Sequence, residues 1–386
     1  MNKLIRRGVV LLALIALIAM TLPAAGGREP AADEMPDTIR IALLSPFTGL
    51  GSILGEYIQR GAWMAVQEIN AAGGIDGRDL DLRIYDTQAD ASVAATVLRR
   101  AINEDRVVAV FGPNMSSAVL GVHRLAEQAK TPMLVGATSP SFRYTEVGNP
   151  YLFRLRADDG IKVYLQVKYA IEELGIERPG VIYGSTDYST ASLAVAERAF
   201  EEFGVEIVAA EQITEGDADA TGQILSLRRA GVDGLIGLTH EPEAAVVVSQ
   251  MRELEFDIPI IGFSAWGVPA FTNLAGDAAI GVYSVQGFNP NDERPEVRTF
   301  VENHAAQYRD RPSDPAQCYY DGIHLLAKAI EQAGTTDGEV LARTLKEIEY
   351  HGVQGRMKAD EHHNFTDISY ISRFDGEDWE IIDILH

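Results

Sequence analysis

Small hydroxyl residues, many of them beside glycine, stand in several short segments that follow apolar runs. Residues 112–117 read GPNMSS, and residues 136–140 read GATSP. Comparable polar segments follow later, at residues 184–188, 239–243 and 263–267. Hydroxyl and backbone N–H groups near the start of a helix are donors, and a helix N-terminus favours an anion. These segments therefore predict loops that favour an anion.

No arrangement typical of catalysis accompanies these segments. The sequence contains neither a Gly-x-Ser-x-Gly elbow nor a P-loop, and single hydroxyls without a placed His and Asp do not form a triad. Gly49, Gly51 and Gly55 do not have the spacing of a dinucleotide fingerprint. His362 and His363 stand beside two acids but lack zinc-ligand spacing, and they predict a polar turn. We expect a non-enzyme with no cofactor and no metal.

Alternating strands and helices must position these segments. The first series predicts strands at residues 39–44, 80–85, 107–111 and 133–135, with helices at 56–70, 92–103 and 118–129. The second predicts strands at 180–183, 206–210, 233–238 and 258–261, with helices at 161–174, 190–203, 223–229 and 244–254. Helices at 315–332 and 338–348 and strand-like runs from 354 to 382 follow. Apolar strands separated by amphipathic helices predict an α/β protein with two doubly wound units.

The N-terminus predicts export. Lys3, Arg6 and Arg7 precede an apolar run at residues 8–22, and small residues follow, which is the tripartite secretory pattern. The run has about 15 residues, fewer than the roughly 20 that span a bilayer as a helix. We therefore expect a cleaved signal peptide at residues 1–27, with an uncleaved anchor as the alternative.

Charge and cysteine content narrow the location and the partners. The chain has 33 basic and 56 acidic residues, so its net charge is 33 − 56 = −23, or −23 − 3 = −26 once the three basic signal residues are removed. Such acidity argues against a nucleic-acid partner. The single cysteine, Cys318, lies far from the signal, so we predict no disulfide framework and no lipoprotein anchor. We expect a mature protein that is a soluble monomer outside the cytoplasmic membrane, with a tether at residues 28–37.

Several runs carry a family resemblance. Residues 69–78 read INAAGGIDGR between a predicted helix and a predicted strand. FGP at 111–113, GATSP at 136–140, AGDAAIGV at 275–282 and YDG at 320–322 follow in matching order. From Ile39 to its end, the chain resembles the periplasmic leucine/isoleucine/valine-binding proteins, which are the extracytoplasmic receptors of ABC importers.

The resemblance implies a type I fold of two lobes joined by three crossovers, with one ligand in the cleft. It implies an amino acid of the branched-chain type, or a similar small carboxylate, delivered to an inner-membrane permease. A sensing module for a membrane receptor or kinase, and a binder of another organic or aromatic carboxylate, remain alternatives. The crossovers map near Leu155, Tyr283 and Gly352, the first lobe to residues 38–155 plus 284–352, and the second lobe to 156–283 plus 353–386.

The resemblance also implies ligand contacts in both lobes. By position, Ser116, Ala137 and Thr138, with Ser139 adjacent, would hold the ligand carboxylate in the first lobe. A desolvated carboxylate needs several donors, which neutral groups can supply. The alternative is that these hydroxyls cap helices. Tyr188 matches a second-lobe tyrosine that closes over the ligand.

One position departs from the family pattern. Members that bind α-amino acids usually carry a carboxylate for the ligand ammonium at the position of Ser264. A buried ammonium without an anion would be costly. The ligand therefore lacks an ammonium, or Glu241, in the loop that begins at Thr239, substitutes; Glu241 is otherwise a first-turn helix acid. Trp266 predicts an apolar wall or core packing, and Leu54 would line the opposite wall.

Overall fold

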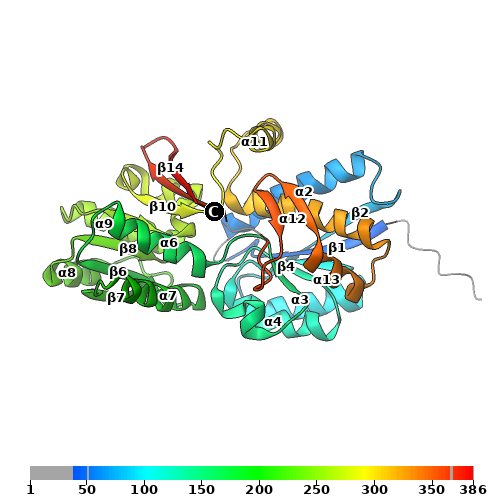
Figure 1. The fold of residues 1–386 in the computed structure, drawn as a ribbon, viewed down its shortest axis with the longest axis horizontal. Coiled ribbons are helices and arrows are strands. Elements are labelled where there is room, and N and C mark those ends of the chain that lie inside the picture. Colours follow the sequence, from blue (N-terminus) through cyan, green and yellow to red (C-terminus); the bar gives the residue numbers. More distant parts are fainter. Residues whose placement is uncertain (1–37, 50–51, 366–367, 386) are drawn as a thin grey trace, which may run out of the picture. The chain divides into compact units, whose positions relative to one another are not determined.

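The computed structural model describes residues 38–49, 52–365 and 368–385. The predicted signal peptide and tether, residues 1–37, lie outside the described residues. The described part forms a five-stranded sheet, a seven-stranded sheet and a two-stranded hairpin. We call the first sheet with its helices the first lobe, and the second sheet with its helices the second lobe (Figure 1).

The first lobe is built on a parallel sheet in the order β2-β1-β3-β4-β5. Its strands are β1 (Thr38–Ser45), β2 (Asp79–Asp86), β3 (Ala109–Phe111), β4 (Met133–Val135) and β5 (Leu152–Arg154). Between them run α2 (Ser52–Ala71), α3 (Ala91–Asn103), α4 (Ser116–Gln128), η1 (Pro140–Phe142) and α5 (Tyr144–Val147). Later in the chain come α11 (Pro295–Tyr308), α12 (Asp314–Ala333), α13 (Gly338–Glu347) and the hairpin β11 (Glu349–Gly352) with β12 (Gly355–Lys358). Helix α12 returns to pack along α2, and Figure 1 shows the orange helix beside the blue one.

The second lobe is built on a mixed sheet in the order β14-β13-β10-β9-β8-β6-β7. Its strands are β6 (Pro179–Gly184), β7 (Ala209–Ile213), β8 (Gly234–Leu238), β9 (Ile260–Gly262), β10 (Tyr283–Gln286), β13 (Ser369–Phe374) and β14 (Trp379–Leu385). Its helices are α6 (Asp159–Glu172), α7 (Asp187–Phe203), α8 (Thr221–Ala230), α9 (Glu241–Glu253), η2 (Ser264–Gly267), α10 (Pro269–Ala275) and η3 (Gly276–Ala279). Strands β6 to β10 pair in parallel, whereas β13 and β14 are antiparallel. The predicted α/β class with two doubly wound lobes is confirmed.

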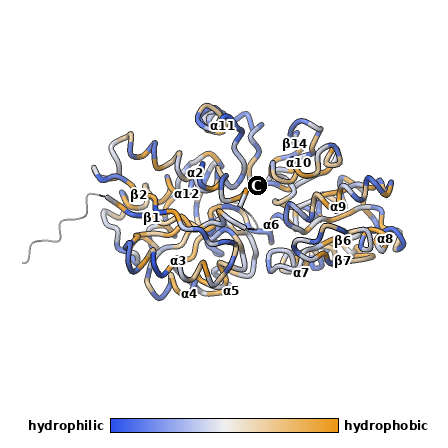
Figure 2. The backbone as a smooth tube through the Cα atoms, turned by 180° about the vertical axis from the view of Figure 1, so that it is seen from behind, coloured by the Kyte–Doolittle hydropathy of each residue, from blue (hydrophilic) through white to orange (hydrophobic). Residues whose placement is uncertain are grey.

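Strand β1 shows how the sequence covers the sheet on both faces. Ile41 and Leu43 point into one core cluster, and Ala42 and Leu44 point into another. Because side chains alternate along a strand, an unbroken apolar run must be buried on both faces. Figure 2 shows the apolar colour at β1, in the interior of its lobe.

The run at residues 69–78 forms the connection from α2 to β2. Gly73 and Gly74 have φ of 104° and 71°, the left-handed region that ends helices at glycine. A Cβ on Gly74 would lie 2.2 Å from the Arg78 carbonyl oxygen, so only glycine fits there. The Asn70 side chain accepts from the Leu80 N–H at 2.8 Å and donates to its carbonyl at 2.9 Å. This run therefore fixes how the helix turns back onto the sheet.

The chain passes between the two sheets at places that differ slightly from the expected ones. Strand β10 pairs with β9 and β13, so the second lobe continues to Gln286 rather than ending at Tyr283. Met357 and Phe365 belong to a first-lobe core cluster, so the first lobe continues well past Gly352. We therefore propose that the last crossing lies after Phe365.

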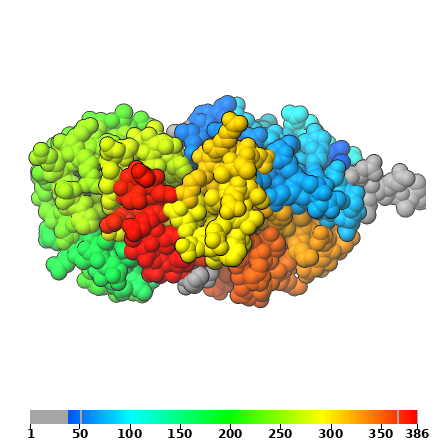
Figure 3. Space-filling model, turned by 90° about the horizontal axis from the view of Figure 1, so that it is seen from above, coloured from blue at the N-terminus to red at the C-terminus, as the bar shows by residue number. Residues whose placement is uncertain are grey.

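The segment that follows β10 is held against both lobes. Helix α11 contacts α2, and the side chains of Asn289 and Asn291 donate to the Trp379 carbonyl at 3.0 Å each. Figure 3 shows this yellow segment between the blue helix and the red C-terminal strands. Neither α11 nor α10 nor β10 is among the elements predicted from sequence, and β7 begins three residues later than the strand predicted at residues 206–210.

Candidate functional site

A polar pocket lies at the carboxyl ends of strands from both sheets. Residues that follow β3, β4 and β5 in the first lobe, and β6, β8 and β9 in the second, contribute to it. Open α/β sheets bind ligands at this end of their strands. The pocket has a cavity volume of about 40 Å³. Its lining consists of Leu54, Asn114, Met115, Ser116, Ala137, Thr138, Arg156, Tyr188, His240, Glu241, Ser264, Ala265, Val268 and Pro315.

Seven of the ten residues proposed from sequence as ligand contacts line this pocket. They are Leu54, Ser116, Ala137, Thr138, Tyr188, Glu241 and Ser264. The other three, Ser139, Thr239 and Trp266, lie outside the lining.

The first-lobe hydroxyls divide between two roles. Ser116 is the first residue of α4, whose N-cap is Met115, so Ser116 does not cap the helix. Its hydroxyl accepts the Ser139 backbone N–H at 3.4 Å. Ser139 is the cap, because its own hydroxyl accepts the N–H of Ser141 at the start of η1. The capping interpretation therefore fits Ser139, whereas Ser116 and Thr138 remain at the pocket wall.

An aromatic column forms part of the second-lobe wall. Tyr188 stacks on His240 with ring centroids 4.6 Å apart and packs on Phe263 with centroids 4.4 Å apart. Burial lowers the pKa of His240 to about 4, so its imidazole is neutral at physiological pH. A neutral imidazole offers one donor and one acceptor. Sequence reasoning named only the loop that contains His240, because a histidine before a proline-containing helix start carries no specific signal.

Glu241 is a buried acid at the pocket wall. It begins α9, as expected of a first-turn helix acid, but only 8 % of it is exposed. Burial raises the pKa of its carboxyl from 4.5 to about 7, and Glu243 raises it further, while its own backbone N–H and Arg156 lower it. Within the described residues, no other group donates a hydrogen bond to this carboxylate. Glu241 is therefore free to accept a donor or a cation from a ligand.

Arg156 brings a permanent positive charge to the pocket. Its Nε donates to the Gly136 carbonyl at 2.6 Å, and its Nη1 pairs with the Asp314 carboxylate at 2.9 Å. Although burial acts to lower the pKa of Arg156, Asp314 more than offsets this and raises it. Sequence reasoning missed Arg156, because it lies in a crossover and its partner is far away in the chain.

Ser264 faces the pocket with a lysine behind it. Lys162, fully buried on α6, donates from Nζ to the Ser264 hydroxyl at 2.8 Å. Burial lowers the pKa of Lys162 to about 8, and Arg156 lowers it further, while Asp159 acts in the opposite direction. Since the Ser264 oxygen accepts from Lys162, its own O–H is left to donate into the pocket.

Trp266 belongs to the second-lobe core. A Cβ built on Gly237 or Gly262 would lie 2.3 or 2.2 Å from its ring, so the indole fills space that only these glycines leave. Phe271 packs on it with centroids 5.6 Å apart. Of its two sequence interpretations, the core packing describes its position. The Thr239 hydroxyl donates to the neighbouring His240 carbonyl at 3.2 Å.

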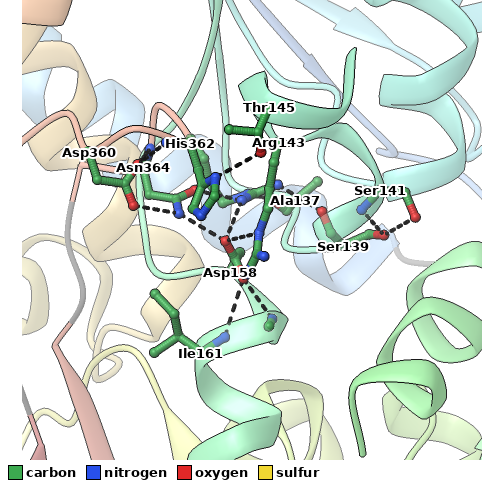
Figure 4. A network of polar contacts seen from close by, with 12 residues as sticks. Ala137, Ser139, Ser141, Arg143, Thr145, Asp158, Ile161, Asp360, His362 and Asn364 are labelled. Carbon is green, nitrogen blue, oxygen red and sulfur yellow. Dashed lines mark hydrogen bonds and ion pairs between the residues drawn. The ribbon is translucent and has the colours of Figure 1, made fainter. Parts of the chain in front are cut away.

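A polar network joins the first and last crossings (Figure 4). Asp158 caps α6 and accepts from Arg143 Nε at 2.8 Å and from Asn364 Nδ2 at 2.8 Å. Arg154 pairs with Asp158 at 3.2 Å and donates to Asn364 at 2.5 Å. Burial acts to raise the pKa of Asp158, but Arg143 and Arg154 hold it at about 2. His362 lies in the polar turn that the sequence predicted, and its Nδ1 shares a hydrogen bond with the Thr145 hydroxyl at 2.9 Å.

Two features are absent from the part of the chain that the structure describes. No group of three or more His, Cys, Asp or Glu side chains gathers there as a metal site. No helix in the same part has both the length and the apolar character needed to cross a bilayer.

Two doubly wound lobes with a polar pocket at their strand ends define a two-lobed binding protein. The family model described as "periplasmic binding protein" matches residues 38–378, and the chain belongs to this family. Its members are solute-binding proteins, a class without catalytic activity.

Three similar proteins illustrate the family. The leucine-, isoleucine-, valine-, threonine- and alanine-binding protein of Pseudomonas aeruginosa is 27 % identical over 84 % of this chain and 86 % of its own. The branched-chain amino acid transporter substrate binding protein of Streptococcus pneumoniae, solved with isoleucine, is 28 % identical over 89 % and 99 % of the two chains, with a TM-score of 0.82. A Rhodopseudomonas palustris solute binding protein solved with 3,4-dihydroxybenzoic acid has a TM-score of 0.82 at 22 % identity over 90 % and 97 %, which shows the shared fold.

Proposed function

We propose that this chain is the extracytoplasmic solute-binding component of an ABC importer and that it binds an α-amino acid of the branched-chain type. The relatives of 27 and 28 % identity support this class of solute. The single observation that carries the amino-acid assignment is Glu241, a buried pocket carboxylate with no partner besides its own backbone N–H among the described residues.

In this proposal the ligand's two charged groups meet opposite walls. The carboxylate contacts Ser116, Ala137 and Thr138, where hydroxyl and N–H donors line the first-lobe wall. The ammonium pairs with Glu241, and Tyr188 covers the ligand from the second lobe. Desolvated charges need such partners, since an unpaired buried charge is costly.

Delivery requires the ligand to favour one arrangement of the lobes. The lobes close by a hinge at the crossovers, and the closed form is presented to a permease. A ligand shifts this equilibrium only by its differential affinity for the closed state. Contacts from both lobes in one pocket provide that difference, because they form together only on closure.

A second candidate is a small carboxylate without an ammonium, and the Ser264–Lys162 pair favours it. Ser264 presents a donor to the pocket, which suits a carbonyl or hydroxyl oxygen of the ligand. If Glu241 is protonated, it becomes a donor as well. The two candidates therefore differ in whether the ligand carries a cation beside its carboxylate.

Leucine and 4-methyl-2-oxopentanoate form a matched pair for this question, because they differ only in ammonium against carbonyl. Calorimetry on the purified chain should show tighter binding of leucine. Tighter binding of the oxo acid would move the assignment to the second candidate. Failure of every amino acid and every small carboxylate in a thermal-shift screen would contradict the proposed function, since a tight ligand raises apparent stability.

A further inference from the structure

A second cavity adjoins the polar pocket. Its cavity volume is about 300 Å³, against about 40 Å³ for the polar pocket. The two share four lining residues, Leu54, Met115, His240 and Glu241, so they adjoin each other. We call the second cavity the outer chamber. Beyond the shared residues, its lining consists of Gly49, Ser52, Ile53, Pro242, Ala270 and Leu274.

The outer chamber is apolar beyond that shared boundary. Ile53 lies at the start of α2, while Ala270 and Leu274 lie on α10. Ile53 is 48 % exposed and Leu274 is 55 % exposed. Single exposed apolar side chains are common, but these two belong to one cavity that opens from a binding pocket. Among the described residues that line the outer chamber, His240 and Glu241 are the only basic and acidic ones, and both lie at the boundary with the polar pocket.

We infer that the outer chamber is a subsite for the apolar tail of a ligand whose carboxylate end lies in the polar pocket. The inference rests on the proposed function, and it names the ligand class more closely. The ligand is a carboxylate-bearing solute whose apolar side chain is longer than that of leucine. The lining residues support this occupant. His240 and Glu241 offer polar contacts at the boundary, and Ile53 and Leu274 offer apolar contacts beyond it.

A tail in the chamber would bury surface that is otherwise wet. Burying a methylene contributes enough to lower a dissociation constant by about fourfold when burial is complete, and by about twofold when it is half complete. Affinity should therefore rise with each methylene that enters the chamber and stop rising once the tail reaches solvent.

The test is calorimetry of the purified chain with 2-aminobutanoic, 2-aminohexanoic, 2-aminooctanoic and 2-aminodecanoic acids. We expect affinity to rise about two- to fourfold per methylene through 2-aminooctanoic acid. Leu274 is exposed, so its replacement should not disturb folding. Leu274→Glu should abolish the gain in affinity beyond 2-aminohexanoic acid and leave the affinity for 2-aminobutanoic acid unchanged. Leu225→Glu is the matched control, since Leu225 is 39 % exposed on α8 and outside the chamber. Ile53→Glu tests the opposite wall.

Each result of this series either supports or contradicts the inference. Short members that bind with no gain from longer tails would overturn the inference and leave the proposed function standing. A gain that survives in both Leu274→Glu and Ile53→Glu would overturn it as well. If these variants instead change the oligomeric state in light scattering without changing the series, the chamber is a protein contact. If no member binds, the matching 2-oxo acids do not bind, and leucine does not bind either, the proposed function fails and the inference fails with it.

Discussion

Replacing Glu241 by Gln tests the amino-acid assignment through two opposite effects, on stability and on binding. In the folded protein, burial raises the pKa of this carboxyl from 4.5 to about 7. At about 1.36 kcal/mol for each tenfold change in proton affinity, this raised pKa corresponds to about 3 kcal/mol. Glu241 is 8 % exposed, so solvent screening reduces this magnitude only slightly.

The sign of the stability effect follows from the raised pKa. The folded state binds the proton more tightly than the unfolded state, so the contribution to stability is full below pH 4.5 and is lost as the pH rises through about 7. Above that pH the protein contains an ionised carboxylate that burial disfavours. The Glu241→Gln variant should therefore be more stable than the natural chain at pH 8, by up to about 3 kcal/mol, and close to it in stability at pH 4.5. Urea unfolding at the two pH values measures the difference.

The effect on binding is opposite in sign. An ammonium ligand needs the ionised carboxylate, so the apparent dissociation constant is divided by the ionised fraction. With a pKa of about 7, affinity should fall about tenfold from pH 8 to pH 6 and about another tenfold at pH 5. Glu241→Gln should weaken leucine by about a hundredfold or more at pH 8, since it leaves the ammonium unpaired.

Glu243→Gln is the matched control for this experiment. Glu243 lies in the same helical turn and is also buried, but its carboxylate accepts the Gly216 N–H at 2.8 Å and it does not line the pocket. Its replacement should leave leucine affinity at pH 8 within a few fold. Two results would refute the reasoning: unchanged leucine affinity in Glu241→Gln, or affinity that increases as the pH falls. The second result would favour a protonated Glu241 that donates to a ligand without an ammonium.

Three further substitutions give separate tests. Ser116→Ala should weaken a carboxylate ligand by about ten- to a hundredfold in calorimetry, while the loss of its contact with the Ser139 N–H should lower the urea midpoint only modestly; equal affinity would remove Ser116 from the site. Asp158→Asn should cost about 3 kcal/mol in urea unfolding at pH 7, because it leaves buried Arg154 poorly paired. The natural chain should lose the same contribution to its free energy of unfolding as the pH falls from about 4 to 2. A free energy of unfolding that does not change over this range would contradict the prediction. Trp266→Ala should cost about 3–5 kcal/mol, and a large loss of affinity without loss of stability would return Trp266 to the site.

The sequence predicts most of the fold because burial on both sheet faces leaves a plain pattern. Strand β1 and helix α2 are clear for this reason. Strand β7 is displaced from the predicted position because it lies at the sheet edge and alternates between half-buried and exposed residues. Helix α11 was not predicted because only Val297, Phe300 and His304 on it are buried, which gives a weak apolar stripe.

The rule that ligands bind at strand ends predicts much of the candidate site, and long-range contacts explain what it leaves out. It selected the loops that contain Ser116, Thr138 and Glu241, which line one pocket. It could not select Arg156, whose place at the pocket depends on a pair with Asp314 from another part of the chain. It could not exclude Trp266 either, since only the packing on two distant glycines shows that the indole turns into the core.

The position of the pocket acid also has a physical explanation in the sheet. Strands β8 and β9 are neighbours, with Gly237 opposite Gly262 in the parallel ladder. Their carboxyl ends therefore open onto the same side of one pocket, and both Glu241 and Ser264 line it. An acid after β8 can thus serve the ligand in place of one after β9, where Lys162 holds a hydroxyl instead. An acid after β8 rather than after β9 moves the negative charge by about one strand spacing, roughly 5 Å. A ligand that pairs with Glu241 must therefore carry its ammonium toward the outer chamber, which Glu241 also borders.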